Sequence, residues 1–84
     1  MPQINVKLFA SLQPFMPDGA VNGEVAVDCG DDTTVTSLLT GLNVPLEKCH
    51  LVILNGVFVP VDQRAGKALV EGDTIAVWPP VAGG

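Results

Sequence analysis

Basic side chains and long apolar runs are scarce in this sequence. Its 84 residues include 4 Lys and Arg against 9 Asp and Glu, which gives a net charge of -5. Phosphate binding needs clustered basic side chains, so we expect no nucleic-acid partner, and a basic protein partner fits the charge better. The apolar runs are much shorter than the roughly 18–20 residues of a membrane span, so we expect no membrane insertion.

Cysteine and histidine are also scarce. The two cysteines, Cys29 and Cys49, are too few and too far apart for a disulfide framework or a zinc site. We therefore expect two reduced, largely buried thiols and no bound metal. The single histidine, His50, follows Cys49, and on a strand the two side chains would point to opposite faces, which argues against a nucleophile–base pair.

The remaining catalytic inventory is nearly empty. Asp31 and Asp32 are interpreted as solvated residues at the start of a helix, where negative charge is favoured. No Gly-rich phosphate loop is present, and we expect the chain to bind no cofactor. The chain is therefore not expected to be an enzyme on its own.

The length predicts one small domain with a packed core. An apolar fraction of 48% and a charged fraction of 15% exclude disorder from low hydrophobicity. The first residues contain no basic segment followed by an apolar one, so we expect no secretory signal and a cytoplasmic location.

Alternating apolar residues predict a sheet. The expected strands are 4–10, 24–29, 50–54, 57–61 and 74–78. Their expected inward side chains are Ile4, Val6, Leu8, Ala10, Val25, Val27, Val57, Ile75 and Val77. Asn55-Gly56 predicts a tight turn, and Pro60 predicts an edge strand. Residues 13–23 are expected to form a loop, and 62–72 an irregular segment anchored by Leu69.

One helix is expected between the second and third strands. Thr33 or Thr34 can cap its start. The apolar stripe consists of Val35, Leu38, Leu39 and Leu42. The helix is expected to end around Gly41, Asn43 and Pro45.

The order of these elements predicts an α+β fold. One main helix would pack across one face of a mixed sheet of about five strands, with the first and last strands parallel at its centre. That arrangement is the ubiquitin-like β-grasp. We expect residues 1–78 to form the core and residues 79–84 an extended tail.

The tail has an unusual composition. It reads Pro79-Pro80-Val81-Ala82-Gly83-Gly84. The prolines cannot extend a sheet ladder, and the two glycines have no side chain, so the terminal carboxylate could enter a narrow channel. The alternative interpretation is a frayed terminus, where small residues are common.

Three of the four aromatic residues are expected to face away from the core. The strand phases place Phe9, Phe58 and Trp78 opposite Leu8, Val57 and Val77. Exposed apolar clusters of this kind often mark a protein-binding surface. The alternative is that a small twisted sheet covers these rings itself.

At these residues the sequence resembles the ubiquitin-like sulfur carriers, the MoaD/ThiS-like family. That family includes the small subunit of molybdopterin synthase and the thiamine-biosynthesis sulfur carrier. The similar segments are Lys7-Leu8-Phe9-Ala10, Leu54-Asn55-Gly56, Glu71-Gly72-Asp73 and 78–84. The Pro-Pro-Val-x-Gly-Gly ending is the specific element and is closest to the molybdopterin-synthase side.

The resemblance implies a function and a set of site residues. An adenylating (E1-like) partner would activate Gly84 with ATP, and sulfur would convert its carboxylate to a thiocarboxylate. Gly83 would let the tail thread into the partner. The implied partner-binding residues are Phe9, Phe58, Trp78, Pro79, Pro80 and Val81.

Three functions remain open at this point. The sulfur acceptor would be an enzyme such as a molybdopterin synthase large subunit, in Mo or W cofactor synthesis. It could instead be a thiazole synthase in thiamine synthesis, or an enzyme of another sulfur-transfer pathway. A third interpretation is a ubiquitin-like binding or conjugation module that carries no sulfur.

Overall fold

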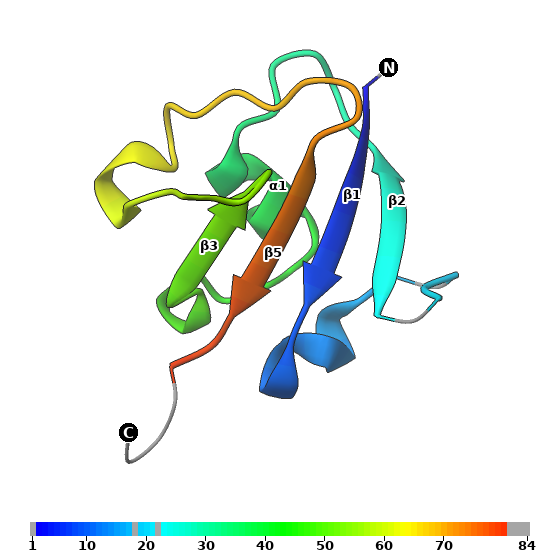
Figure 1. The fold of residues 1–84 in the computed structure, drawn as a ribbon, viewed down its shortest axis with the longest axis vertical. Helices are drawn as coiled ribbons and strands as arrows, with labels where there is room; N and C mark the ends of the chain where they lie inside the picture. The colour runs from blue at the N-terminus through cyan, green and yellow to red at the C-terminus, as the bar shows by residue number, and fades with distance from the viewer. Residues whose placement is uncertain (1, 18, 22, 81–84) are drawn as a thin grey trace.

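The computed structural model describes residues 2–17, 19–21 and 23–80, and these form a helix-on-sheet fold (Figure 1). The sheet has five strands in the order β2-β1-β5-β3-β4. The strands are β1 (Gln3–Leu8), β2 (Glu24–Asp28), β3 (Leu51–Leu54), β4 (Val57–Phe58) and β5 (Thr74–Trp78). β1 and β5 pair in parallel at the centre, and every other pair is antiparallel. The predicted β-grasp is confirmed.

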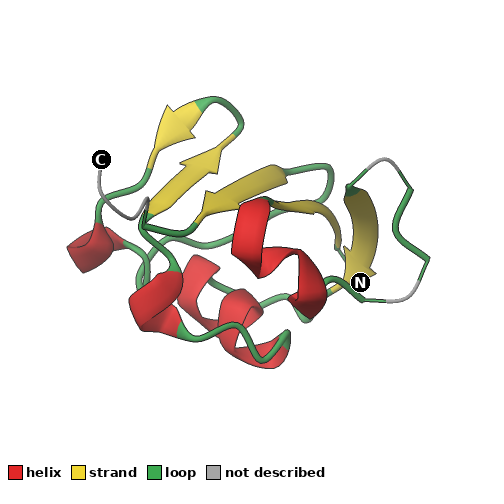
Figure 2. Cartoon of the chain, turned by 90° about the horizontal axis from the view of Figure 1, so that it is seen from below, coloured by secondary structure: helices red, strands yellow, loops and turns green. Residues whose placement is uncertain are grey.

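The helical segments lie on one side of the sheet (Figure 2). They are α1 (Val35–Gly41) and three 3-10 helices: η1 (Ala10–Phe15), η2 (Leu46–Lys48) and η3 (Val61–Gln63). In the part of the chain that the structure describes, no helix is long and apolar enough to span a membrane.

Helix α1 begins and packs as its sequence predicts. Thr34 is its N-cap: the hydroxyl of Thr34 accepts from the Ser37 N–H at 3.2 Å, and the Ser37 hydroxyl accepts from the Thr34 N–H at 2.7 Å. The stripe side chains Val35, Leu38 and Leu39 are buried, and Leu42 packs against the core partly buried. Asn43, with φ of 64°, then turns the chain away.

The core lies between the sheet and the helical layer. The inward side chains Ile4, Val6, Leu8, Ile75 and Val77 are each at most 1% exposed. Leu69 is 2% exposed and anchors the segment before β5, as predicted. Both cysteines are free and buried, which confirms their interpretation as small apolar residues.

The expected first strand is too long. β1 ends at Leu8, and Ala10 is exposed rather than inward. Ala10 has φ of 53°, a left-handed conformation that ends the ladder. The chain then forms η1, which starts at the last residue of the expected strand and runs into the expected loop 13–23, and Leu12 within it is completely buried.

The expected fourth strand is also too long. β4 has two residues, and it is the edge strand that Pro60 predicted. Pro60 has no N–H for a ladder, and it is the N-cap of η3. Val57 pairs with the buried Leu54, yet it is 66% exposed at this edge. The prediction that Val57 lies inward in the core is therefore wrong.

Candidate functional site

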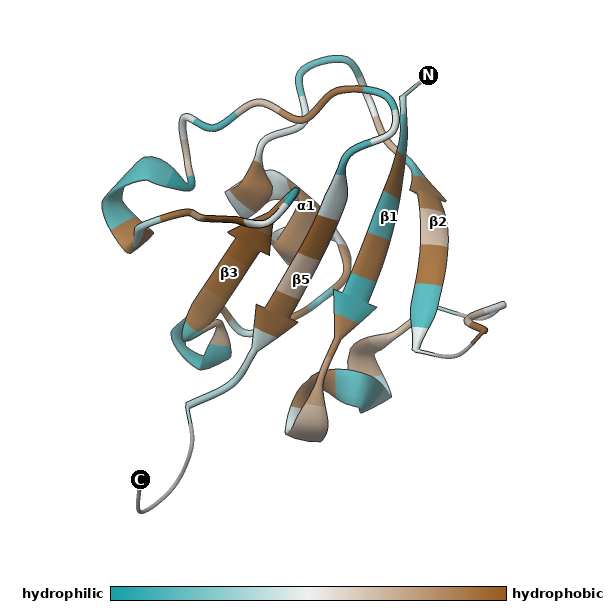
Figure 3. Ribbon diagram, viewed as in Figure 1, coloured by the Kyte–Doolittle hydropathy of each residue, from teal (hydrophilic) through white to brown (hydrophobic). Residues whose placement is uncertain are grey.

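The sheet face opposite the helices carries an apolar cluster at one end. Strand register places Phe58 beside Ile53 and Ile53 beside Ala76. The next row runs from Leu51 to Trp78, and Phe9 follows Leu8, the partner of Val77. We call the set Phe9, Leu51, Ile53, Phe58, Ala76 and Trp78 the aromatic patch. Figure 3 shows the apolar composition of β3 and the alternation along β5.

The aromatic rings of the patch are exposed to different degrees. Phe9 and Trp78 stack, with ring centroids 4.4 Å apart and planes 3° from parallel. Both residues are partly buried, and in the stack each ring covers one face of the other. Phe58 is 50% exposed and forms the accessible aromatic of the patch.

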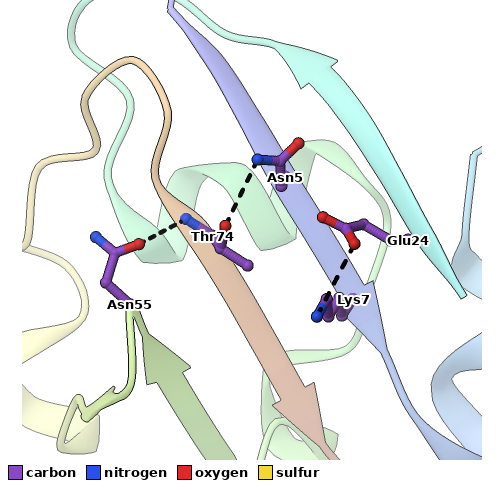
Figure 4. Close-up of polar contacts among 5 residues, drawn as sticks. All are labelled: Asn5, Lys7, Glu24, Asn55 and Thr74. Carbon is purple, nitrogen blue, oxygen red and sulfur yellow. Dashed lines mark hydrogen bonds and ion pairs between the residues drawn. The ribbon is translucent and has the colours of Figure 1, made fainter.

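The other end of the same face is polar (Figure 4). The Asn55 side chain accepts from the Thr74 N–H at 2.8 Å, and the Asn5 amide donates to the Thr74 hydroxyl at 3.5 Å. Lys7 and Glu24, 3.9 Å apart as a partly exposed ion pair, lie instead in the row of Ala76, on its β2 side. The apolar part of the face therefore covers β3 and β5 where β5 ends and the tail departs, and the ion pair borders it toward β2.

A buried arginine fixes the point where the tail leaves the sheet. The Trp78 carbonyl accepts from the His50 N–H at 3.0 Å. Arg64, 6% exposed, donates to the carbonyls of Cys49 (2.6 Å), His50 (3.2 Å) and Val59 (3.1 Å). Burial lowers the pKa of Arg64. The guanidinium thus ties the turn before β3 to the segment after β4.

Sequence reasoning missed Arg64, Leu51 and Ile53. Arg64 lies in an irregular segment without periodicity, and no local pattern marks it as buried. Leu51 and Ile53 had a usable signal, because they alternate with Val52 and Leu54, which the structure buries.

Only part of the predicted tail site lies within the described residues. Pro79 is buried and Pro80 is exposed, so Pro80 is the accessible one of the two. Val81, Gly83 and Gly84 lie outside the described residues, as does most of the expected tail 79–84.

The catalytic candidates that the sequence argued against do not come together. Cys49 is buried and His50 is exposed, and β3 begins at Leu51, one residue after the expected start at His50. Burial raises the pKa of both thiols, with Asp28 adding to the effect at Cys29. Asp31 and Asp32 are exposed and precede the N-cap. Among the residues described, no group of three or more His, Cys, Asp or Glu could hold a metal ion.

Comparison with solved structures places the fold among small ubiquitin-like proteins. Small archaeal modifier protein 1 of Haloferax volcanii aligns with a TM-score of 0.70 and 27% identity, covering 96% of this chain and 100% of that one. The thiamine biosynthesis protein ThiS of Geobacter metallireducens aligns with a TM-score of 0.61 and 23% identity, over 95% and 99% of the two chains.

A third structure is a complex of subunits 1 and 2 of the molybdopterin-converting factor from Helicobacter pylori. It aligns with a TM-score of 0.59 and 18% identity, over 98% of this chain and 99% of that chain. Comparison with curated protein sequences found no match.

A family comparison agrees with this assignment. The family described as Mut7-C ubiquitin matches residues 1–83. Because that match spans nearly the whole chain, the protein belongs to the Mut7-C ubiquitin family, and its resemblance to the ubiquitin-like β-grasp sulfur-carrier family is confirmed.

Proposed function

We propose that this protein is a sulfur carrier whose C-terminal Gly84 is adenylated by a partner enzyme and converted to a thiocarboxylate. The observation that carries the proposal is the position of the tail: it leaves β5 at Trp78, a member of the aromatic patch. An enzyme that docks on the patch would therefore receive the tail beside its docking site. The fold and the Gly-Gly ending support the same function.

The chemistry assigns the difficult step to the partner. A carboxylate is a poor acyl donor, because nucleophilic attack on it must expel an oxide-like group. Attack of the Gly84 carboxylate on ATP releases pyrophosphate and forms an acyl adenylate. Hydrosulfide then attacks the acyl carbon, AMP leaves, and the thiocarboxylate remains on Gly84. The carrier supplies a docking face and a reachable carbonyl, and the partner supplies the catalysis.

The tail residues have separate roles in this proposal. Gly83 and Gly84 have no side chain, so they fit a narrow channel that leads to the nucleotide. Pro80, which is exposed, stiffens the approach, and Val81 contacts the channel wall. Pro79 is buried, so its role is to fix the direction in which the tail leaves.

We propose a Mo or W cofactor pathway as the destination of the sulfur. The Pro-Pro-Val-x-Gly-Gly ending supports this destination, and the acceptor would be the large subunit of a molybdopterin synthase. The runner-up acceptor is a thiazole synthase or an enzyme of another sulfur-transfer pathway. Both would use the same patch and tail.

A second candidate function belongs to a different class. The similarity to a small archaeal modifier protein, at a TM-score of 0.70, favours a module that joins other proteins through its C-terminus. Such a module would use the same adenylation, but an amine would displace AMP and sulfur would not remain on Gly84.

Intact-mass analysis separates the two functions. Protein purified from its native cell should carry a mass increase equal to the replacement of one oxygen by sulfur, located on Gly84. Adducts to lysines of other proteins without that increase would favour conjugation. Co-purification from the same cells then identifies the acceptor enzyme. Recovery of a molybdopterin synthase large subunit would indicate the Mo or W cofactor pathway, and recovery of a thiazole synthase would indicate thiamine synthesis.

A further inference from the structure

The sheet has an edge that is open to another strand. Within the part of the chain that the structure describes, β2 is paired on one side only, with β1. The bond from the Cys29 N–H to the Pro2 carbonyl (2.8 Å) fixes which residues of β2 face β1. By alternation along an antiparallel ladder, the main-chain groups of Ala26 and Asp28 point away from β1.

The opposite end of this edge is already occupied. The Glu24 N–H donates to the Val21 carbonyl at 3.1 Å, and the Val21 N–H donates back at 2.8 Å. The open part of the edge is therefore Ala26 and Asp28. The other edge strand, β4, has only two residues and is followed by Val59 and Pro60, so it offers a poorer template.

An apolar hollow lies beneath the open edge, between β2 and α1. Its volume is about 210 Å³. Its lining includes Val27, Cys29, Leu38, Gly41 and Leu42. A cavity of about 150 Å³ is enough to bind benzene, so this hollow has room for a branched aliphatic side chain.

The charge around the open edge has one sign. Asp28, Asp31 and Asp32 are all exposed, and no basic residue lines the hollow. Glu24 lies on the same strand but has a partner, since it pairs with Lys7. A second copy of this chain is a poor occupant, because edge-to-edge pairing would bring Asp28 near its equivalent between two chains of net charge -5.

We propose that the β2 groove, defined as the open edge at Ala26 and Asp28 with the hollow beneath it, binds an extended basic segment of a partner protein. The segment adds a strand to the sheet, and its main chain pairs with Ala26 and Asp28. Side chains of an added strand alternate between faces. An aliphatic side chain opposite Val27 enters the hollow, and a Lys or Arg opposite Asp28 lies beside that carboxylate.

This groove is separate from the proposed docking face for the sulfur enzymes. β2 is one edge of the sheet (Figure 1), and the residues of the aromatic patch lie on β5, β3 and β4 and directly after β1. The groove also lies on the helix side, whereas the patch lies on the opposite face. A partner can therefore hold the β2 groove while the tail is engaged elsewhere.

A short peptide tests the groove directly. The probe is an acetylated and amidated pentapeptide, Lys-Ile-Lys-Val-Lys, whose alternation matches the two faces. Its control has the same composition in the order Ile-Val-Lys-Lys-Lys. Amide chemical shifts of the protein are followed by NMR during titration. We expect saturable shifts at residues 25–29 and 35–42, and about tenfold weaker binding of the control.

Paired variants show whether the groove causes the binding. Gly41→Leu adds a large side chain to the lining of the hollow at a position where a Cβ meets nothing within 4 Å. Gly66→Leu is its control, since Gly66 has the same free space outside the groove. Asp28→Asn removes the charge, with the exposed Asp62→Asn as control. Ala26→Pro removes an edge N–H without removing a bond to β1.

The expected results are specific to the groove. Gly41→Leu and Ala26→Pro should each lower the affinity for the probe peptide about tenfold, and Asp28→Asn should lower it about threefold. The control variants Gly66→Leu and Asp62→Asn should bind the peptide as the parent chain does. If Ala26→Pro fails to fold, Gly41→Leu decides. The proposal is overturned if the scrambled peptide binds equally, if the shifts map to Leu51–Phe58, if the probe does not bind at millimolar concentration, or if Gly41→Leu has no effect.

Discussion

At the residue scale, Phe58 and Trp78 belong to one patch but differ in how much of each side chain is exposed. Phe58 is 50% exposed on a two-residue edge strand. Trp78 is less exposed, because its ring stacks on that of Phe9. Truncation of Phe58 therefore removes mainly accessible surface, and truncation of Trp78 also removes a packed partner. This difference in surroundings gives two separate predictions.

Phe58→Ala should weaken partner binding more than it weakens the fold. An exposed aromatic anchor contributes roughly 2–4 kcal/mol at an interface. Its loss from a solvated position should reduce the free energy of unfolding by only about 0.5–1 kcal/mol. Calorimetric titration with the adenylating enzyme and urea melts measure the two effects. Val77→Ala is the control, since Val77 is fully buried and its truncation should reduce stability first.

Trp78→Ala should cost stability as well as binding. A stacked aromatic pair adds about 0.5–1.5 kcal/mol beyond its buried area. A double-mutant cycle with Phe9→Ala measures this coupling in the free energy of unfolding. Additive effects of the two substitutions would show that the stack contributes nothing to the fold.

The two buried thiols predict a loss of stability in alkaline solution. Burial raises the pKa of Cys29 and Cys49, so the folded state holds these protons more tightly than the unfolded state does. The free energy of unfolding should be constant with respect to these groups below about pH 8.5 and should fall as pH rises above it. The Cys29→Ala and Cys49→Ala double variant should lose this decline between about pH 8.5 and pH 10. Urea melts across this pH range measure the free energy of unfolding of both proteins. An equal decline in the parent chain and in the double variant would show that other groups cause it.

At the scale of elements, the sequence predicted the types better than the ends. The helix stripe of α1 and the alternation of β1, β2 and β5 are local signals, and the structure confirms each. The end of β1 was not predictable, because it depends on Ala10 adopting φ of 53° so that Leu12 can reach the core. The 3-10 turns are set by such tertiary contacts and have no periodicity of their own.

Arg64 joins elements that are far apart along the chain, and its loss should loosen the tail exit. The guanidinium donates to three carbonyls, two of them in the turn that also bonds to Trp78. Hydrogen bonds to a charged group contribute about 1.5–3 kcal/mol each, so Arg64→Ala should reduce the free energy of unfolding by at least about 3 kcal/mol. Urea denaturation measures this loss.

Arg64→Lys is the informative companion variant. Lysine keeps the charge but lacks the planar fork that reaches three carbonyls at once, so it should recover only part of the stability. Amide hydrogen exchange at His50 should quicken in both variants. Unchanged exchange at His50 in Arg64→Ala would contradict the role of this side chain at the tail exit.

At the scale of the whole molecule, the division of the surface was partly visible in the sequence. Strand phase placed Phe9, Phe58 and Trp78 on one face, and the structure agrees for all three. Phase alone did not show that Phe9 and Trp78 cover one another, because that depends on the parallel register of β1 and β5. The β2 groove was also beyond local patterns, since it combines a strand edge with a helix wall.

The position of the aromatic patch relative to the tail bears on how a small chain could be used by a partner enzyme. The aromatic patch lies where β5 ends at Trp78, and the Lys7–Glu24 pair borders it toward β2. In the proposed function this patch is the docking area, and the carboxylate that reacts is that of Gly84. Residues 79–84, fully extended, reach at most roughly 20 Å, which sets how far an active site can lie from the patch.

The most direct test of this account is sulfur loading of Gly84 by a purified adenylating partner with ATP and a sulfur donor, read by intact mass. The parent chain should gain thiocarboxylate. Chains that lack Gly84, or that carry one extra residue after it, should gain none while melting at the same temperature as the parent. Full loading of the extended chain without proteolytic trimming would contradict the account.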